Sequence, residues 1–219
     1  VGNEEGVAPY PCWSTADSTT NADGTRVING LNGDPFAPFW CPGESDFTLR
    51  WNRSFQGGWF WTAGQDSMMF TLPELLTKYE TSVGRNTNML LGLVIDDKGL
   101  IPDADVRQVE ALGKEITRQY GSPLQQTSGT GSEFVISFDK PVSINRVILQ
   151  EDISKGERVL KYTLKGKMNN EWIDLSSGTC IGHKHINRFE AQTLDAIKLV
   201  VDESKADPLI MNFSVFETI

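Results

Sequence analysis

The spacing of hydrophobic residues changes near Gly121 and divides this 219-residue chain into two parts. Before that point, two segments carry apolar residues three and four positions apart, which is the period of an α-helix. Beyond it, apolar and polar residues alternate, which is the period of a strand with one buried face. We therefore predict an α/β part over residues 1–120 and an all-β domain over residues 121–219.

A first helix is predicted to begin at Thr71. Thr71 and Glu74 form a capping-box pair, and Pro73 falls in the first turn, where a missing N–H removes no hydrogen bond. Gly84 follows the last apolar position and favours the end of the helix. The apolar residues at helical spacing are Leu72, Leu75, Leu76, Tyr79 and Val83.

A buried strand and a second helix are expected next. Residues 89–95 form a continuous apolar run bounded by turn signals, which is typical of a parallel strand buried on both faces. Asp103 is the expected cap of the second helix. The order helix, buried strand, helix predicts the C-terminal portion of a (β/α)8-type barrel more readily than a complete domain. The apolar face of the second helix is expected to hold Val106, Val109, Leu112, Ile116 and Tyr120.

The region beyond Gly121 is interpreted as a series of short strands. Residues 129–132 have the composition of a linker or loop, and turn residues separate the alternating segments that follow. We predict an antiparallel β-sandwich of jelly-roll type. The alternating apolar residues are Phe134, Ile136 and Phe138; Val147 and Leu149; Leu160, Tyr162 and Leu164; Ile197, Leu199 and Val201; and Met211, Phe213 and Val215.

Residues 1–70 contain few periodic segments but hold five of the six tryptophans. Their Gly, Pro, Asn and Asp content predicts long loops, and long loops over a scaffold are where binding and catalytic groups gather. The density of aromatic residues argues against disorder.

The net charge of −9 excludes the basic surface that a nucleic-acid partner requires. No apolar run approaches the roughly 20 residues of a membrane-spanning helix. Neither nucleic acid nor a membrane span is therefore expected.

The cysteines and histidines do not match a metal-binding pattern. The three cysteines form no disulfide framework, and their spacing fits no zinc motif. A Cys12–Cys41 bridge requires the first loop to fold back on itself, and buried thiols are the favoured interpretation. His183 and His185 would share one face of a strand, but no third ligand is evident, so a structural role is favoured over a metal pair.

Several motifs resemble a known family. Residues 1–6 (VGNEEG), 11–15 (PCWST), 41–46 (CPGESD), 58–61 (GWFW) and 82–86 (SVGRN) follow one another in this order. The succession resembles the second half of the catalytic barrel of glycoside hydrolase family 29, the α-L-fucosidases, and is most similar to the branch that removes α-1,3/4-linked fucose. Residues 156–159, 181–184 and 204–210 resemble the discoidin-like (coagulation-factor type C) domain that follows the barrel in that branch.

The resemblance implies a retaining exo-glycosidase, which uses two carboxylates about 5–5.5 Å apart. It assigns the general acid/base to Glu44, where Phe39 and Trp40 would desolvate the carboxyl group and raise its pKa. The nucleophilic aspartate of the family is expected upstream of Val1. We therefore expect this chain, which lacks a start methionine and a signal peptide, to need an N-terminal barrel segment as partner. The mechanism needs no metal or organic cofactor, and a glycan substrate suggests a secreted, periplasmic or lysosome-like location.

Substrate contacts are predicted from aromatic and acidic residues. Trp13, Trp59 and Trp61 are candidate walls of the sugar site, because an indole packs against the apolar patch around the C6 methyl of fucose. Glu5, together with its neighbour Glu4, follows what reads as a strand end, where a barrel places its active site.

Two further features of this region bear on those assignments. Asp46 is expected to accept a hydrogen bond from Arg50. The step from Arg50 to Trp59 is longer than in the family, which shifts the register of the tryptophans.

Two alternatives remain open from the sequence. The sandwich could act as a carbohydrate-binding or structural module without catalysis by this chain, and the whole could serve as a hydrolase of a different sugar.

Overall fold

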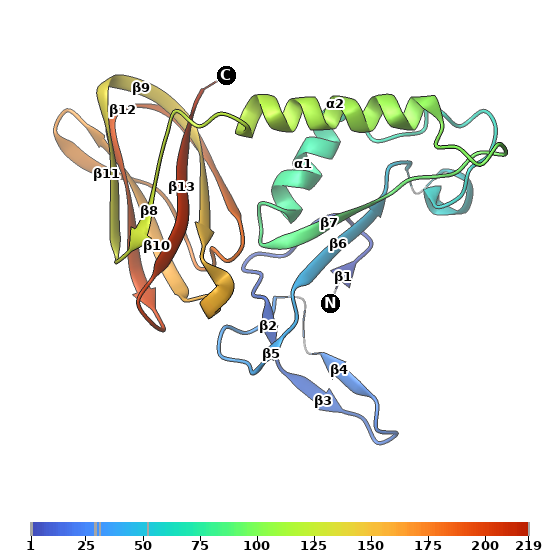
Figure 1. Cartoon of the computed structure of the whole chain (residues 1–219), viewed down its shortest axis with the longest axis horizontal. Helices are drawn as coiled ribbons and strands as arrows, with labels where there is room; N and C mark the ends of the chain where they lie inside the picture. The colour runs from blue at the N-terminus through green and yellow to red at the C-terminus, as the bar shows by residue number, and fades with distance from the viewer. Residues whose placement is uncertain (1, 29, 31, 52, 219) are drawn as a thin grey trace.

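The computed structural model describes residues 2–28, 30, 32–51 and 53–218. Figure 1 shows an α/β part beside a part built almost entirely of strands, with the long helix α2 running from one toward the other. Within the described ranges, no helix is both long and apolar enough to cross a membrane. The elements of the α/β part are β1 (Gly2–Asn3), β2 (Thr15–Ala16), β3 (Ser18–Thr20), β4 (Arg26–Ile28), β5 (Phe39–Trp40), β6 (Gly43–Thr48), η1 (Phe55–Gly58), α1 (Leu72–Ser82), β7 (Thr87–Gly92) and α2 (Asp103–Tyr120).

A parallel three-stranded sheet in the order β1-β6-β7 is the centre of the α/β part. Gly2 lies opposite Glu44, and Glu44 lies opposite Asn88, so these three residues share one face. Both helices pack on the other face, where Phe47 of β6 and Leu49, the residue after it, meet Leu75 of α1 and Leu112 of α2. The sheet is thus covered by helices on one face only.

Helix α1 confirms the capping prediction. Thr71 is its N-cap, the capping box with Glu74 is formed, and Pro73 lies in the first turn. The helix ends at Ser82, with Gly84 two residues beyond it.

Helix α2 spans the predicted residues, but two details of the prediction are wrong. Pro102 is the N-cap, and Asp103 is the first helical residue, without a capping hydrogen bond. Val106 is 50% exposed and does not belong to the cluster in which Leu112, Val109 and Ile116 pack against the sheet.

The strand predicted over residues 89–95 is not buried on both faces. Strand β7 spans Thr87–Gly92; Met89 and Leu91 pack toward the helices, while Leu90 is 49% exposed. Among the described residues no layer covers the second face, so its apolar side chains stay accessible. We call this second face, which holds Glu44, Asp46, Thr48 and Leu90, the open face.

The β-rich part is a six-stranded antiparallel sheet in the order β11-β10-β12-β9-β13-β8, consistent with a β-sandwich. Most of the alternating residues that the sequence singled out lie in its core, including Ile136, Leu164 and Phe213, but Met211 is 51% exposed and Leu160 lies outside the core cluster. The strands are β8 (Gln125–Thr130), β9 (Glu133–Glu151), β10 (Val159–Met168), β11 (Glu171–Gly178), β12 (His185–Ser204) and β13 (Leu209–Glu217), with the short helix η2 (Ile153–Lys155) between β9 and β10.

The β-rich part differs from the prediction in three places. Residues 129 and 130, expected in a linker, belong to β8, because Gly129 and Thr130 pair with Ile210 and Leu209 of β13. The two short strands expected between Phe134 and Leu149 are one strand, β9, with irregular register. Strand β11 was not anticipated, because as an edge strand it keeps most of its side chains in solvent.

One junction between the two parts centres on the buried Asn86, in the turn between α1 and β7. Its Nδ2 donates to the carbonyl of Cys12 (2.9 Å) and to Oε1 of Glu157 (2.5 Å), and its Oδ1 accepts from the amide of His183 (2.6 Å). The Cys180 thiol donates to the Cys12 carbonyl at 3.2 Å. Cys12, Cys41 and Cys180 all carry thiols, so the Cys12–Cys41 bridge is not formed.

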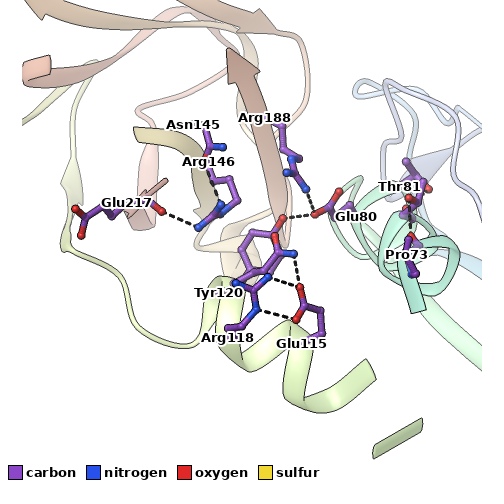
Figure 2. A network of polar contacts seen from close by, with 12 residues as sticks. Pro73, Glu80, Thr81, Glu115, Arg118, Tyr120, Asn145, Arg146, Arg188 and Glu217 are labelled. Atoms are coloured by element: carbon purple, nitrogen blue, oxygen red, sulfur yellow. Dashed lines mark hydrogen bonds and ion pairs between the residues drawn. The ribbon is translucent and has the colours of Figure 1, made fainter. Parts of the chain in front are cut away.

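Figure 2 shows a second junction, where the C-terminal end of α2 meets the sandwich. The Tyr120 hydroxyl donates to Glu80 of α1, and Arg188 of β12 donates to the same carboxylate at 2.5 Å. The Arg146 guanidinium lies 5.9 Å from the centre of the Tyr120 ring and donates to the Glu217 carbonyl. Tyr120 also packs against Ile148, Ile186 and Phe216, so both helices are attached to the sandwich.

His185 lies between the two parts and is 9% exposed. Its ring lies 4.7 Å from that of Tyr10 and 6.0 Å from that of Tyr162, and the described residues give its Nδ1 no hydrogen-bond partner. Burial, assisted by the positive charge of Arg85, lowers the pKa of His185 from 6.5 to about 4.

This shift predicts an acid-sensitive fold. The unfolded imidazole takes up a proton near pH 6.5 and the folded one only near pH 4, so His185 contributes stability above pH 6.5 that is lost as the pH falls from 6.5 to about 4. The loss corresponds to about 3 kcal/mol. We expect His185→Phe to flatten the dependence of the urea midpoint on pH across this window. His183→Gln, at the exposed histidine, is the control, and an unchanged pH dependence in His185→Phe would contradict the assignment.

Candidate active site

A cavity of about 620 Å³ lies at the carboxyl ends of the parallel strands. In α/β structures the loops that follow these strand ends converge there, and ligands bind among them. The residues lining the cavity include Glu4 and Glu5 after β1, Thr48 at the end of β6, and Trp51, Arg53 and Trp59 from the loop that follows β6.

The acidic pair is carried by a tightly held turn after β1. The amide of Glu5 donates to Oδ1 of Asn3 at 3.0 Å, and the amide of Gly6 donates to the carbonyl of Asp46 at 3.0 Å. Gly6 has a φ of +68°, and a side chain there would overlap the Phe47 ring. Glu4 and Glu5 follow β1 in this turn, outside the strand itself, and both line the cavity.

The loop that follows β6 folds back onto the end of the strand. The Thr48 hydroxyl donates to the Arg50 carbonyl at 2.6 Å and lies 3.2 Å from the Gly57 carbonyl. Trp59 then lies over Gly92 at the end of β7, where an added Cβ would come within 2.8 Å of the indole. The absence of a side chain at Gly92 therefore makes room for Trp59, which is 38% exposed.

A buried ion pair fixes the same end of β6. Arg50 is 1% exposed; its Nη2 lies 2.5 Å from Oδ1 of Asp105, which is fully buried in the first turn of α2, and 3.1 Å from Asp66. The expected bond from Arg50 to Asp46 is not formed, because Arg50 lies beyond the end of the strand and turns toward α2. Oδ1 of Asp46, on the open face, has no hydrogen-bond partner among the described residues.

Glu44, the carboxylate that the sequence favoured, lies elsewhere. It is the second residue of β6 and is exposed on the open face opposite Gly2 and Asn88. It lies four positions before Thr48 and opposite Gly2, and it is not among the described residues that line the cavity. The structure therefore groups Glu5 and Trp59, but not Glu44, with the loops at the carboxyl ends.

The other predicted tryptophans are also separated from the cavity. Trp13 is 7% exposed and its backbone lies against Gly33, as in ordinary packing. Trp61 is half-buried two residues beyond Trp59 and is not among the described residues that line the cavity.

The two histidines do not share a strand face, in agreement with the favoured loop or structural interpretation. His183 is exposed in the loop before β12, whereas His185 is buried at its first residue. Across the described part of the chain, no group of three His, Cys, Asp or Glu side chains is arranged to hold a metal ion.

Sequence reasoning gave Glu4 less weight than the structure does and missed Arg53 and Trp51. The signal for Glu4 was its place directly after a strand, beside Glu5, and the sequence could not show which of the two acidic residues enters the site. The sequence shows that the loop between Arg50 and Trp59 is longer than in the family. That this loop folds back onto Thr48 through Gly57 depends on tertiary contacts.

Comparison with known proteins shows that the homologues of this chain are glycoside hydrolases, the α-L-fucosidases. A protein of Oryza sativa subsp. japonica assigned as alpha-L-fucosidase 1 is 30% identical, and the match covers 99% of this chain and 47% of that protein. Alpha-L-fucosidase 1 of Arabidopsis thaliana is 27% identical over 99% of this chain and 49% of its own length. The chain thus spans about half the length of these relatives. No family model matches it.

Solved structures give the same result. A Bacteroides thetaiotaomicron protein assigned as an α-L-fucosidase is 36% identical, with a TM-score of 0.92 over 100% of this chain and 50% of that protein. A glycoside hydrolase 29 family member from a rumen bacterium is 27% identical, with a TM-score of 0.85 over 99% of this chain and 40% of that protein. Both the α/β part and the β-rich part therefore have counterparts in these structures.

The two carboxylates that pair with Arg50 are expected to differ greatly in their contribution to the free energy of unfolding. Asp105→Asn leaves a buried guanidinium without its buried counter-charge, and we expect a loss of about 3–5 kcal/mol in the free energy of unfolding measured in urea. Asp66→Asn removes a partner whose side chain is 58% exposed, and we expect a loss below about 1 kcal/mol. Equal losses in the two variants would show that burial of the pair does not decide its contribution.

The close packing of Trp59 over Gly92 predicts that a side chain at position 92 displaces the indole. Gly92→Ala places a methyl group against the indole and should move Trp59 away from the end of β7. We expect a shift of the Trp59 signal in 19F NMR of protein labelled with 5-fluorotryptophan, with Trp59→Phe assigning the signal. Gly113→Ala, in α2 with no atom near the added methyl, is the control. A Trp59 signal that does not move in Gly92→Ala would contradict the packing.

Proposed function

We propose that this chain is part of a retaining exo-α-L-fucosidase that removes terminal α-1,3/4-linked fucose from glycans. The observation that carries the proposal is the gathering of Glu4, Glu5, Thr48, Arg53 and Trp59 at the carboxyl ends of three parallel strands. This is where glycosidase barrels place their carboxylates, and the homologues are α-L-fucosidases. The linkage preference rests on the motifs that resemble one branch of family 29.

We assign the general acid/base role to Glu4 in preference to Glu44. Glu4 follows β1 and lines the cavity, within the same group of loops as Trp59. Glu44 remains the candidate that the motif resemblance suggests, and it lies at the opposite end of β6. Glu5, which also lines the cavity, is assigned to support of the turn and of the substrate.

The open face and the free edges of the sheet support a further barrel segment as partner. Among the described residues, β1 and β7 each pair only with β6, and Leu90 of β7 is exposed on the open face beside Asp46 of β6. Strand edges and apolar faces of this kind favour association with further strands. In the proposal that segment completes a (β/α)8-type barrel and supplies the nucleophilic aspartate.

The β-rich part is assigned a supporting role, as a discoidin-like jelly-roll domain over residues 121–219 that follows barrel residues 1–120. Its contacts with the two helices, through Asn86, Glu80 and Tyr120, favour support of the barrel over independent sugar binding. A glycan substrate favours a secreted, periplasmic or lysosome-like location.

The experiment uses this chain alone and a chimera. In the chimera, the chain replaces the half of the Bacteroides thetaiotaomicron protein that it matches. We expect the chimera to release fucose from a trisaccharide carrying α-1,3/4-linked fucose. Glu4→Gln in the chimera should lower this rate by at least about a hundredfold, yet spare aryl fucosides with good leaving groups, which need no proton donor.

Glu44→Gln and Glu5→Gln are the matched variants and should keep the dependence on the leaving group of the parent chimera. A selective loss in Glu44→Gln would instead assign the acid to Glu44. A folded chimera that releases no fucose would refute the fucosidase proposal, and release by the chain alone would show that it contains its own nucleophile.

A further inference from the structure

Lys78 of α1 reaches across to the acidic turn at the end of β1. Its ammonium donates to the carbonyl of Glu5 at 2.6 Å and lies 4.7 Å from the ring centres of both Phe47 and Phe70. The side chain thus joins the helix layer, strand β6 and the turn. We propose that Lys78 is a positioning residue, which holds the turn over residues 3–6 so that the carboxylate of Glu4 lines the cavity.

The geometry of the turn supports this role. Asn3 is bonded to the turn by its side chain, which accepts from the amide of Glu5 and donates to the carbonyl of Val7. Gly6 is fixed by the Asp46 carbonyl and by the Phe47 ring. The Glu5 carbonyl lies between these two attachments, and Lys78 is the helix residue that bonds it.

The ammonium group suits this position better than a neutral donor would. A cation over two aromatic rings is attracted by both π faces, so Phe47 and Phe70 direct the Lys78 side chain toward the turn. Burial lowers the pKa of Lys78, and the negative charges of Glu74 and Glu5 oppose this effect.

The proposal rests on the proposed function in one respect, since it identifies Glu4 as the group to be positioned. The turn itself can be tested without any substrate. The amides of Glu5 and Gly6 are hydrogen-bonded to Asn3 and Asp46, so their hydrogen exchange reports how firmly the turn is held.

The experiment compares amide exchange in the full chain with that of Lys78→Met, which removes the donor and the charge but keeps the apolar stem. We expect exchange at Glu5 and Gly6 to become about tenfold faster, as the loss of one hydrogen bond implies, with amides of α1 unchanged. Lys78→Arg keeps both the donor and the contact with the rings, and should restore the original rates. Lys114→Met, at an exposed lysine of α2, is the control.

Unchanged exchange at Glu5 and Gly6 in Lys78→Met would overturn the proposal, and so would a rise throughout α1, which would indicate general loosening. In the chimera, Lys78→Met should lower kcat for the trisaccharide while sparing the aryl fucoside, because only the first needs a well-placed acid. Equal losses on both substrates would also overturn it. Because exchange is measured without sugar, failure of the fucosidase assay leaves this result interpretable.

Discussion

The buried amide of Asn86 is the contact on which the arrangement of this protein depends. It binds the N-terminal loop through Cys12 and the sandwich through Glu157 and His183, from a turn that also begins β7. Its φ of +66° is one that asparagine tolerates better than most residues. Without this amide, the carboxylate of Glu157 would keep only the amide of Ser14 as a donor among the described residues. The position of β7 relative to the sandwich is therefore set by hydrogen bonds of a buried group.

A second set of hydrogen bonds connects the sandwich to the helices, and through the helices to the strand ends beside the cavity. Glu80 of α1 and Tyr120 of α2 are bonded to each other, and Arg188 attaches them to the sandwich (Figure 2). The same helices hold the strands, since α2 presents Asp105 to Arg50 at the end of β6. The β-rich part thus supports one face of the sheet, while the opposite, open face stays accessible for the chemistry proposed for the fucosidase.

Local signals predicted those elements whose residues interact with near neighbours in sequence. The capping box of Thr71 and Glu74 is a contact over three residues, so α1 was found. Strand β6 was missed as a central strand, because Glu44, Asp46 and Thr48 give it a polar face and only its register with β7 shows that Ser45, Phe47 and Leu49 lie beneath the helices. Strand β8 was missed for the same reason, since its polar residues gain their place by pairing with β13.

The sequence by itself determined the change from α/β to all-β near Gly121, the two helices, the core positions of the sandwich, the likeness to α-L-fucosidases and the presence of acidic pairs among aromatic loops. Only the tertiary structure decided which carboxylates meet which aromatics. Glu44 and Glu4 look equivalent along the chain, yet parallel pairing of β1 with β6 places Glu44 within the sheet, opposite Gly2, and leaves Glu4 in the turn that follows β1. The physical reason is that a site at strand ends depends on the register and direction of neighbouring strands. Pairing between residues about 40 positions apart in the sequence, such as Gly2 and Glu44, fixes that register, and no local sequence pattern can reveal it.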